Sequence, residues 1–318
     1  MNPGFLFHVL DSGYERLRAL TGDGRSGLNL DLVRGFRLLL PPPDEQRAIA
    51  AVLDAMDEAI ERAEVVIAAT KTLRKALLDE LLTRGVPGWH IQWKHVPGIG
   101  TMPADWEVVR LGDVARVQTG RALNHRPGLP SGQEVPYLTV ANVKDGYIDL
   151  TTVKRMHVSE PEIDRYRLRV GDVLFTEGGD ADKLGRGTVW RGDIDVCLHQ
   201  NHIFAVRTPP HRLLPAFLAG YAASTAGKKY FLGAAKQTTN LASVNSSQLL
   251  QMPLPLPPIE EQVRLVDLAQ AQAELLADLA RELQGLRELK VATGSSLLAG
   301  RVRVRKMELE APKEDRHG

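Results

Sequence analysis

Two stretches of the sequence, Leu40-Pro41-Pro42-Pro43-Asp44-Glu45-Gln46 and Leu256-Pro257-Pro258-Ile259-Glu260-Glu261-Gln262, are copies of one another, 216 residues apart. The match extends without gaps over 38–86 and 254–302, where 13 of 49 aligned residues are identical. Average residue usage would give about three or four identities. The sequence therefore contains an internal repeat, and this repeat decides its architecture.

Each copy of the repeat is predicted to form one long helix that begins directly after its prolines. Proline is tolerated only before or within the first turn of a helix, and acidic residues at 44, 45, 260 and 261 suit the positive end of the helix dipole. Apolar residues then follow at the three- and four-residue steps of a coiled coil. They are Ile49, Leu53, Met56, Ile60, Ala63 and Ile67 in the first copy, where the polar Thr70 takes the next step, and Leu265, Ala269, Leu276, Leu279, Leu283 and Leu286 in the second, where Gln272 interrupts the series.

The segment between the helices is predicted to be an α/β globular domain. Short apolar segments alternate with glycine turns, and a helical stretch follows from Leu214 through Ala222 toward Leu232. Because the ends of a domain often lie close together, we expect the two helices to run antiparallel. The predicted strands are 106–111, 137–143, 153–158, 173–176, 188–191 and 203–207.

The predicted organisation has six segments. Residues 1–43 resemble the end of the central domain, because Phe5-Leu6 and Asn29 repeat Phe217-Leu218 and Asn245, so they are interpreted as the remnant of a first such domain. Prolines and glycines in 86–102 predict a linker. The remaining segments are the first helix at 44–85, the complete domain at 103–258, the second helix at 259–302 and a polar tail at 303–318, which we expect to be disordered.

The composition is that of a globular protein with no global preference for polyanions. Of 318 residues, 43% are hydrophobic and the formal net charge is +1, so any nucleic-acid binding must come from local patches. The single cysteine, Cys197, cannot form an internal disulfide and fits a reducing compartment, so we expect a cytoplasmic location. The sequence contains no secretory signal and no apolar run near 18 residues, so we expect no membrane contact.

The residue patterns that usually mark catalysis are absent from the sequence. It contains no Asp/Asn-Pro-Pro-Tyr/Phe segment, phosphate loop, His-Glu-x-x-His or Gly-x-Ser-x-Gly. His199 and His202 have no further metal ligands nearby in the sequence and are predicted to be structural. The glycine-rich loop 178–187 lacks the glutamate of a calcium loop and is predicted to join two strands of a hairpin. We therefore predict neither a catalytic site nor a metal site.

Several loops carry side chains suited to DNA, which is bound by cations at phosphates and read by arginines and amides at base edges. Loop 119–126 contains two arginines and an asparagine, 178–187 would display a lysine and an arginine, and 228–240 is basic and then rich in amides. A solvated surface can have the same composition. The candidate DNA-binding residues are Arg121, Asn124, Arg126, Lys183, Arg186, Lys229, Lys236, Gln237 and Asn240.

Taken together, these residues resemble the specificity subunit of type I restriction-modification systems. The resemblance rests on the repeated Leu-Pro-Pro-x-x-Glu-Gln, the domain opening at 103–114, Gly-Asp-Val-Leu-Phe at 171–175, and Thr-Thr-Asn-Leu at 238–241 leading to Asn245. In that family two target-recognition domains each read half of a split DNA site, and two antiparallel helices separate them. The resemblance implies an α/β target-recognition domain plus two long antiparallel coiled-coil helices, with residues 1–43 as the remnant of a first target-recognition domain.

The resemblance also implies a non-catalytic subunit with defined partners. These are double-stranded DNA, methyltransferase subunits, a restriction subunit and, if the chain acts as a half-subunit, a second copy of itself. The helices would dock the methyltransferase through Glu45, Gln46, Glu261 and Gln262. This chain would bind no cofactor, and S-adenosylmethionine, ATP and Mg²⁺ would lie on partner subunits. Two alternatives stay open: a coiled-coil protein-interaction adaptor, and the recognition part of a fused nuclease or methyltransferase.

Overall fold

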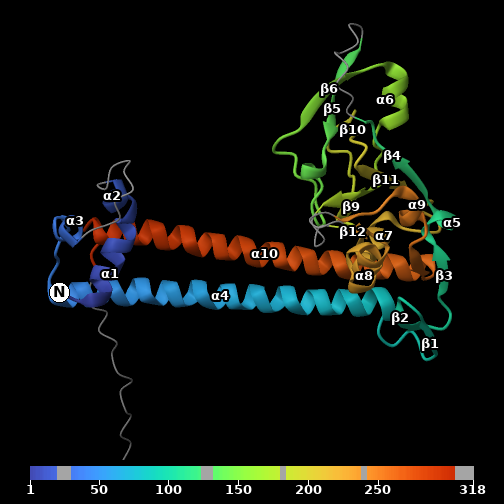
Figure 1. Cartoon of the computed structure of the whole chain (residues 1–318). Coiled ribbons are helices and arrows are strands. Elements are labelled where there is room, and N and C mark those ends of the chain that lie inside the picture. Colours follow the sequence, from blue (N-terminus) through green and yellow to red (C-terminus); the bar gives the residue numbers. More distant parts are fainter. Residues whose placement is uncertain (20–29, 123–131, 180–183, 238–241, 305–318) are drawn as a thin grey trace, which may run out of the picture. The chain divides into compact units, whose positions relative to one another are not determined.

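The computed structural model describes residues 1–19, 30–122, 132–179, 184–237 and 242–304. The chain forms two compact units. The helical unit comprises residues 1–71 and 274–318, and the head unit comprises residues 72–273. Helices α4 (Pro43–Arg84) and α10 (Ile259–Leu298) each contribute to both units (Figure 1).

The helices α4 and α10 begin at the repeated prolines, as predicted. The backbone N–H of Gln46 donates to the carbonyl of Pro42, and that of Gln262 donates to Pro258. Helix α4 ends before Gly85, whose φ of +76° suits the left-handed residue that commonly terminates a helix. Helix α10 ends at Leu298, four residues before the predicted end of the second helix.

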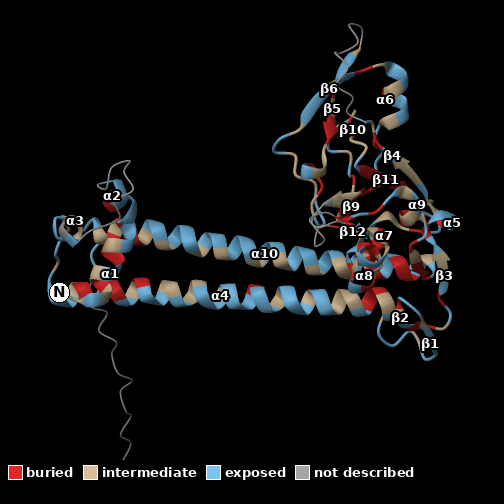
Figure 2. Ribbon diagram, in the orientation of Figure 1, coloured by how far each residue is buried: buried red, intermediate tan, exposed pale blue. Residues whose placement is uncertain are grey.

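The two long helices run antiparallel within each unit, which confirms the predicted fold class. In the helical unit, Arg287 near the end of α10 donates to Glu64 of α4 at 2.6 Å. In the head unit, Leu81 and Leu82 at the end of α4 share a core with Leu265 near the start of α10. Buried residues lie mainly toward the two ends of α4, as Figure 2 shows.

Short helices complete the helical unit at the N-terminus. The side chain of Asn2 accepts from the backbone N–H of Phe5 and caps helix α1. Two further helices follow α1. The elements are α1 (Pro3–Ser12), α2 (Tyr14–Ala19) and α3 (Leu30–Arg34), and the buried core is Phe5, Val9, Ile49, Ala50, Leu53 and Leu297.

A four-stranded antiparallel sheet with the order β4-β11-β7-β9 lies at the centre of the head unit. All four residues of β7 are buried, and so are the first four of β11, because these two strands occupy the middle of the sheet. Helices α7 and α8 share a core with this sheet. The elements are β4 (Arg116–Thr119), β7 (Val173–Thr176), β9 (Gly187–Val189), β11 (Ile203–Arg207), α7 (Pro215–Ala223) and α8 (Thr225–Ala234).

Smaller sheets surround the central one. Strand β5 pairs antiparallel with β6 and parallel with β10, and three further groups of strands have the pairings β1-β2, β14-β3 and β12-β13-β8. The strands are β1 (Trp93–Val96), β2 (Gly100–Pro103), β3 (Glu107–Arg110), β5 (Gln133–Leu138), β6 (Lys154–Val158), β8 (Gly178–Gly179), β10 (Leu198–His199), β12 (Lys236–Gln237), β13 (Ala242–Ser243) and β14 (Pro253–Leu256). The short helices are α5 (Leu111–Val114), α6 (Glu160–Tyr166) and α9 (Ser246–Leu250), with a 3-10 turn at Val140–Asn142.

The predicted elements differ from the structure at three places. Residues 86–102, predicted as a linker, contain the β1 strand and most of β2, which form a hairpin. The strand predicted at 137–143 ends at Leu138, because the buried Asn142 accepts from the backbone N–H of Thr139 and turns the chain. The single predicted helix over 214–232 is two helices, because Ser224 ends α7 and its hydroxyl caps α8 by accepting from Gly227.

His199 joins the three-stranded sheet to the central sheet. Its Nδ1 lies 3.1 Å from the carbonyl of Tyr166 and its Nε2 lies 3.4 Å from the carbonyl of Gln118 in β4. The side chain is fully buried, and this burial lowers the pKa of His199 to about 4. The neutral imidazole is therefore a structural element, in agreement with the sequence interpretation.

We expect acid to destabilise the head unit through His199. The folded-state pKa lies below the unfolded value of about 6.5, so the unfolded chain takes up this proton first, and about 3 kcal/mol is lost as the pH falls from 6.5 to 4. All four tryptophans lie in the head unit, so their fluorescence in urea titrations reports on it. His199→Gln should flatten this pH dependence, whereas His211→Gln, at an exposed position, should not. Equal slopes in the two variants would contradict the assignment.

Candidate nucleic-acid interface

The candidate loops meet at one end of the central sheet. Strand β4 ends at Thr119 opposite Phe204 of β11, and β7 ends at Thr176 opposite Ile203, the first residue of β11. Strand β9 begins at Gly187, opposite Phe175 near the end of β7. The residues that follow β4 and β7 and precede β9 and β11 therefore share one end of the sheet. We call the described residues 119–122, 177–179, 184–187 and 199–203 the loop end.

Backbone hydrogen bonds fix the loop end. The N–H of Arg121 donates to the carbonyl of His199, and the N–H of Asn201 donates to the carbonyl of Arg121. Glu177 accepts from Val244, and this bond places β13 and its neighbour β12 beside the same loops. A Cβ atom at Gly120 would lie 2.2 Å from the carbonyl oxygen of His199, so this close approach requires glycine.

The two candidate arginines of the described loops face carboxylates, but only Arg121 is hydrogen-bonded to one, because the buried Arg186 Nε has no hydrogen-bond partner among the described residues. Arg121 Nε lies 2.8 Å from Glu162 Oε1, and Arg186 Nε lies 3.7 Å from Asp145 Oδ2. The pKa of Glu162 is lowered, first by the hydrogen bond from the Ser159 backbone and then by the one from Arg121. These arginines therefore carry compensated charge in the free protein, and their availability for DNA depends on exchanging one anion for another.

The lysines of this region are less constrained. Lys228 Nζ lies 3.9 Å from Asp145 Oδ2, the carboxylate that also faces Arg186, so α8 lies beside the loop end. The next residue, Lys229, is exposed, and so is Lys236 in β12. Neither has an ion pair within the described part of the chain. Lys229 and Lys236 are therefore the candidate cations most available to phosphates.

Several candidates cannot be placed. Asn124, Arg126, Lys183 and Asn240 lie outside the described residues. The backbone of Gln237 pairs with Ala242 in β12-β13, but its side chain is also outside the description. These five assignments stay predictions.

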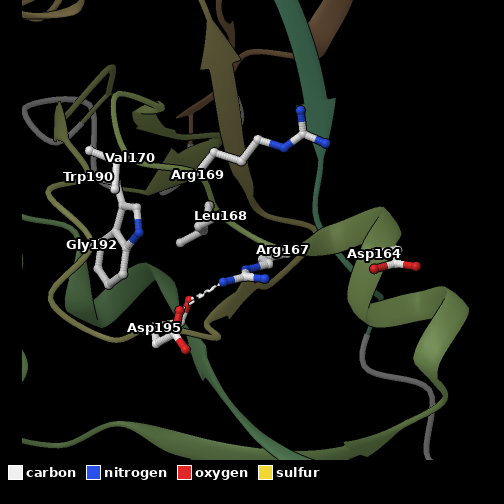
Figure 3. Close-up of a pocket in the computed structure, with 8 residues that line it drawn as sticks. All are labelled: Asp164, Arg167, Leu168, Arg169, Val170, Trp190, Gly192 and Asp195. Atoms are coloured by element: carbon white, nitrogen blue, oxygen red, sulfur yellow. Dashed lines mark hydrogen bonds and ion pairs between the residues drawn. The ribbon is translucent and has the colours of Figure 1, made fainter.

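The opposite end of the central sheet contains a cavity of about 400 Å³ (Figure 3). It is lined by residues that precede β7, including Arg167 and Arg169, and by residues that follow β9, including Trp190. Arg167 Nη2 lies 2.9 Å from Asp195 Oδ1, so one of its two arginines is neutralised. None of the candidate DNA-binding residues lines this cavity.

Gln262, predicted to dock a partner, is instead an internal clamp. It is fully buried, and its Nε2 donates to the carbonyls of Pro257 and Arg212, both at 2.9 Å. Its Oε1 accepts from the backbone N–H of Leu214, the residue that precedes α7. The amide therefore ties the start of α10 to the start of α7.

Gln46 repeats this arrangement in the helical unit. Its Nε2 donates to the carbonyl of Pro41 at 2.7 Å, and its Oε1 accepts from the backbone N–H of Asn2 at 2.8 Å. Asn2 precedes α1 as Leu214 precedes α7. In both copies of the repeat, a glutamine side chain therefore ties the start of the long helix to the residue that precedes a short helix.

Glu261 is the second internal connector of the head unit. Its Oε1 accepts from the backbone N–H of Val86 at 3.0 Å and lies 2.7 Å from His90 Nε2. Its Oε2 accepts from Trp106 Nε1 at 2.8 Å. The carboxylate therefore connects the start of α10 to the end of α4 and to the opening of the domain. His90 and Trp106 are functional partners that sequence reasoning missed, although Trp106 stands in the domain-opening motif.

The assignment of partner docking is corrected for Gln46, Glu261 and Gln262, and it stays a prediction for Glu45. Gln46, Glu261 and Gln262 are at most 3% exposed, so their side chains have no surface for a second subunit. The side chain of Glu45 is 14% exposed. A polar motif that repeats at helix starts indicated an interface, but it satisfies buried backbone groups of the chain itself.

The described residues offer neither a metal site nor a membrane-spanning helix. That part of the chain contains no group of three histidine, cysteine, aspartate or glutamate side chains placed to hold a metal ion. The lone Cys197 is buried, and burial raises the pKa of its thiol to about 12. Within the described ranges, no helix is both long enough and apolar enough to span a membrane.

The fold defines a class of protein in which an α/β domain lies, in the sequence, between two long helices. Residues 103–281, more than half of the chain, match the family model of the type I restriction modification DNA specificity domain, and the chain belongs to this family. It is 25% identical to the type I restriction enzyme MjaVIII specificity subunit of Methanocaldococcus jannaschii, over 96% of this chain and 72% of that protein. It is 24% identical to the EcoKI specificity subunit of Escherichia coli K12, over 83% of this chain and 57% of that protein.

Solved structures show the same fold. The crystal structure of the HsdS subunit from Thermoanaerobacter tengcongensis matches 95% of this chain and 71% of that one, with a TM-score of 0.53 and 22% identity. Among three curated relatives, the chain spans from 45% to 72% of the relative's length.

Gln262→Ala should destabilise the head unit by about 3 kcal/mol, because it removes a fully buried amide and leaves the buried Pro257 carbonyl and the partly buried Leu214 N–H and Arg212 carbonyl without their partner. Urea unfolding followed by tryptophan fluorescence measures the loss. Gln251→Ala, at an exposed position nearby in the sequence, is the control and should change little. A cost at Gln262 no larger than that at Gln251 would show that the amide is not a clamp.

Proposed function

We propose that this chain is the non-catalytic DNA-recognition subunit of a type I restriction-modification complex, and that the loop end contacts double-stranded DNA. The observation that carries the proposal is the placement of Arg121, Arg186 and Lys236 at the loop end, beside a buried sheet, with Lys229 exposed on the neighbouring helix α8. Membership of the specificity-domain family supports the same conclusion. Loops on a rigid scaffold are where proteins commonly place recognition residues.

The proposed contacts divide by chemistry. Lys229 and Lys236 neutralise phosphates, which supplies affinity without sequence information. Arg121 and Arg186 leave their neighbouring carboxylates to contact phosphates or guanine edges. The side-chain amides of Asn124, Gln237 and Asn240 read bases. The hydrogen bond to Glu162 positions Arg121 before DNA arrives, and Asp145 lies 3.7 Å from Arg186.

The proposed complex supplies chemistry that this chain lacks. Methyltransferase subunits dock on the long helices, and a restriction subunit joins the assembly in the cytoplasm. S-adenosylmethionine, ATP and Mg²⁺ are held by those subunits and not by this chain. Large apolar side chains are exposed on both helices within the helical unit, namely Val65, Val66, Leu289 and Val291, with exposed fractions of 50 to 72%. We assign methyltransferase docking to these residues in place of Gln46, Glu261 and Gln262.

Replacing Lys229 and Lys236 by alanine should weaken DNA binding uniformly across sequences. Each lost phosphate contact lowers the slope of log K against log salt by about 0.9, so the double variant should show a slope smaller by about 2. Fluorescence anisotropy with labelled duplexes at several salt concentrations measures this. Arg169→Ala removes a cation at the opposite end of the sheet and should leave the slope unchanged. A smaller slope for Arg169→Ala alone would place the DNA at the cavity instead.

Val66→Glu combined with Val291→Glu should abolish co-purification with the methyltransferase subunit while leaving DNA binding by the free chain intact, because both introduce charge into exposed apolar positions. Val170→Glu, at a 75% exposed position of the head unit, is the matched control and should co-purify normally. The recovered complex is then supplied with S-adenosylmethionine, and the methylated adenines are mapped. Methylation by the chain alone, or no sequence preference in the complex, would contradict the proposal.

A further inference from the structure

A second cavity of the head unit, of about 300 Å³, lies between α8 and the turn of the β1-β2 hairpin. Its walls are two tyrosine rings, the ring of Pro253, small residues of α8 and, from the hairpin turn, Gly98. Lys229 is the one charged residue among the described residues that line it. The cavity is therefore apolar, with a single cation.

Tyr221, at the end of α7, brings an unused hydrogen-bonding group to this cavity. The residue is 1% exposed, and its ring packs in the main core of the head unit. Burial raises the pKa of its phenol, and no hydrogen bond from the described residues offsets this effect. The hydroxyl of Tyr230, in contrast, donates to the carbonyl of Gln248 at 2.6 Å. Because buried polar groups seldom stay without a partner, the Tyr221 hydroxyl indicates a ligand that supplies one.

The two segments that form the cavity contain no acidic residue. All of its lining lies within residues 81–104 and 196–259, which have neither aspartate nor glutamate. Lys229 is exposed and has no ion pair among the described residues, whereas its neighbour Lys228 faces Asp145. An anionic group on a ligand would therefore meet a cation and no repelling carboxylate from these segments.

The size and shape of the cavity suit an aromatic ligand. An apolar protein cavity of about 150 Å³ accommodates benzene, so a volume of about 300 Å³ suits a two-ring aromatic group. The ring of Tyr230 is fixed by its hydrogen bond to Gln248, and together with Pro253 it offers flat apolar surfaces against which such a group packs.

We propose that this cavity binds a two-ring aromatic group that carries a carboxylate. The ring system fills the apolar space, the Tyr221 hydroxyl accepts a hydrogen bond from a ring N–H, and Lys229 pairs with the carboxylate. Both a free aromatic acid and a tryptophan beside an acidic residue of a polypeptide present this chemistry. The site goes beyond the proposed DNA recognition, and its test needs no DNA.

The test uses the purified full chain and 5-fluoroindole-3-propionate, observed by fluorine NMR. The signal should change saturably, with a Kd on the order of a millimolar or lower. Gly233→Leu fills the cavity and should abolish binding. A Cβ atom at Gly233 meets nothing within 4 Å, so the helix accepts the leucine. Gly285→Leu, at an equally open glycine of α10 in the helical unit, is the matched control and should bind the probe normally.

Two further variants assign the polar contacts. Tyr221→Phe removes one hydrogen bond and should weaken binding of the indole probe about fivefold, yet leave unchanged the binding of a fluoronaphthalene propionate, which lacks the ring N–H. Lys229→Gln should weaken binding of the carboxylate about threefold at low salt but leave that of the corresponding amide unchanged. Lys228→Gln, beside Asp145, should change neither.

A blocked dipeptide, N-acetyl-5-fluorotryptophanyl-glutamate amide, distinguishes the two sources of the ligand. Binding at least as tight as that of the free acid identifies a polypeptide, and weaker binding identifies a small molecule. The proposal is overturned if the probe does not saturate, if Gly233→Leu binds it as well as Gly285→Leu does, or if Tyr221→Phe or Lys229→Gln affects its two paired probes equally. Water alone would then satisfy the Tyr221 hydroxyl.

Discussion

A buried carboxylate at the start of α10 is the constraint on which the head unit depends. Glu261 is 2% exposed, and an ionised group at that depth persists only with donors on both oxygens. Its donors, Val86, His90 and Trp106, come from segments 155 to 175 residues away in the sequence. The end of one helix, the hairpin that follows it and the opening of the domain must therefore all be in place before α10 can begin where it does.

The polar side chains of Glu261 and Gln262 fix the geometry of packing more than they stabilise the fold. A buried ion loses its hydration, and an apolar residue of similar volume is often at least as stabilising. Apolar contacts, however, tolerate sliding along a helix, whereas the carboxylate of Glu261 and the amide of Gln262 are satisfied in one register only. The Gln262 amide uses both N–H groups and its carbonyl on backbone atoms, which fixes the direction of α7 relative to the helix start.

What could be predicted from the sequence was local in origin. The prolines and the helical periodicity placed α4 and α10, and short apolar runs placed β7 and β11 at the residues where they occur. The 3-10 turn at Val140–Asn142 was missed, because it is formed by a buried amide whose partners lie up to ten residues away. The β1-β2 hairpin was missed because glycines in a linker and glycines in a turn look alike, and only the pairing distinguishes them.

In the candidate site, too, features of local origin could be predicted from the sequence, and those that depend on residues distant in the sequence could not. Alternating strands and glycine turns were enough to name loops 119–126 and 178–187 as candidates, but not that they meet at one end of a sheet, and the Arg121–Glu162 pair joins residues 41 positions apart and left no local pattern. The Glu-Gln repeat was misread for a related reason. A motif repeated at two helix starts has the same sequence signature whether it faces a partner or satisfies the chain's own backbone.

In the two copies of the Glu-Gln pair, the glutamine and the glutamate contact different segments of the chain. Gln46 and Gln262 each bond to a proline carbonyl before the long helix and to the residue that precedes a short helix. Glu261 accepts from Trp106, in the opening segment of the domain that precedes α10, whereas the partner of Glu45 among the described residues is Arg303 at 3.8 Å. Since the helix start forms in both copies, the glutamine is sufficient for local folding. The glutamate is then the residue whose partners differ between the two helix starts, because Glu261 joins three segments of the head unit, whereas Glu45 faces Arg303 among the described residues.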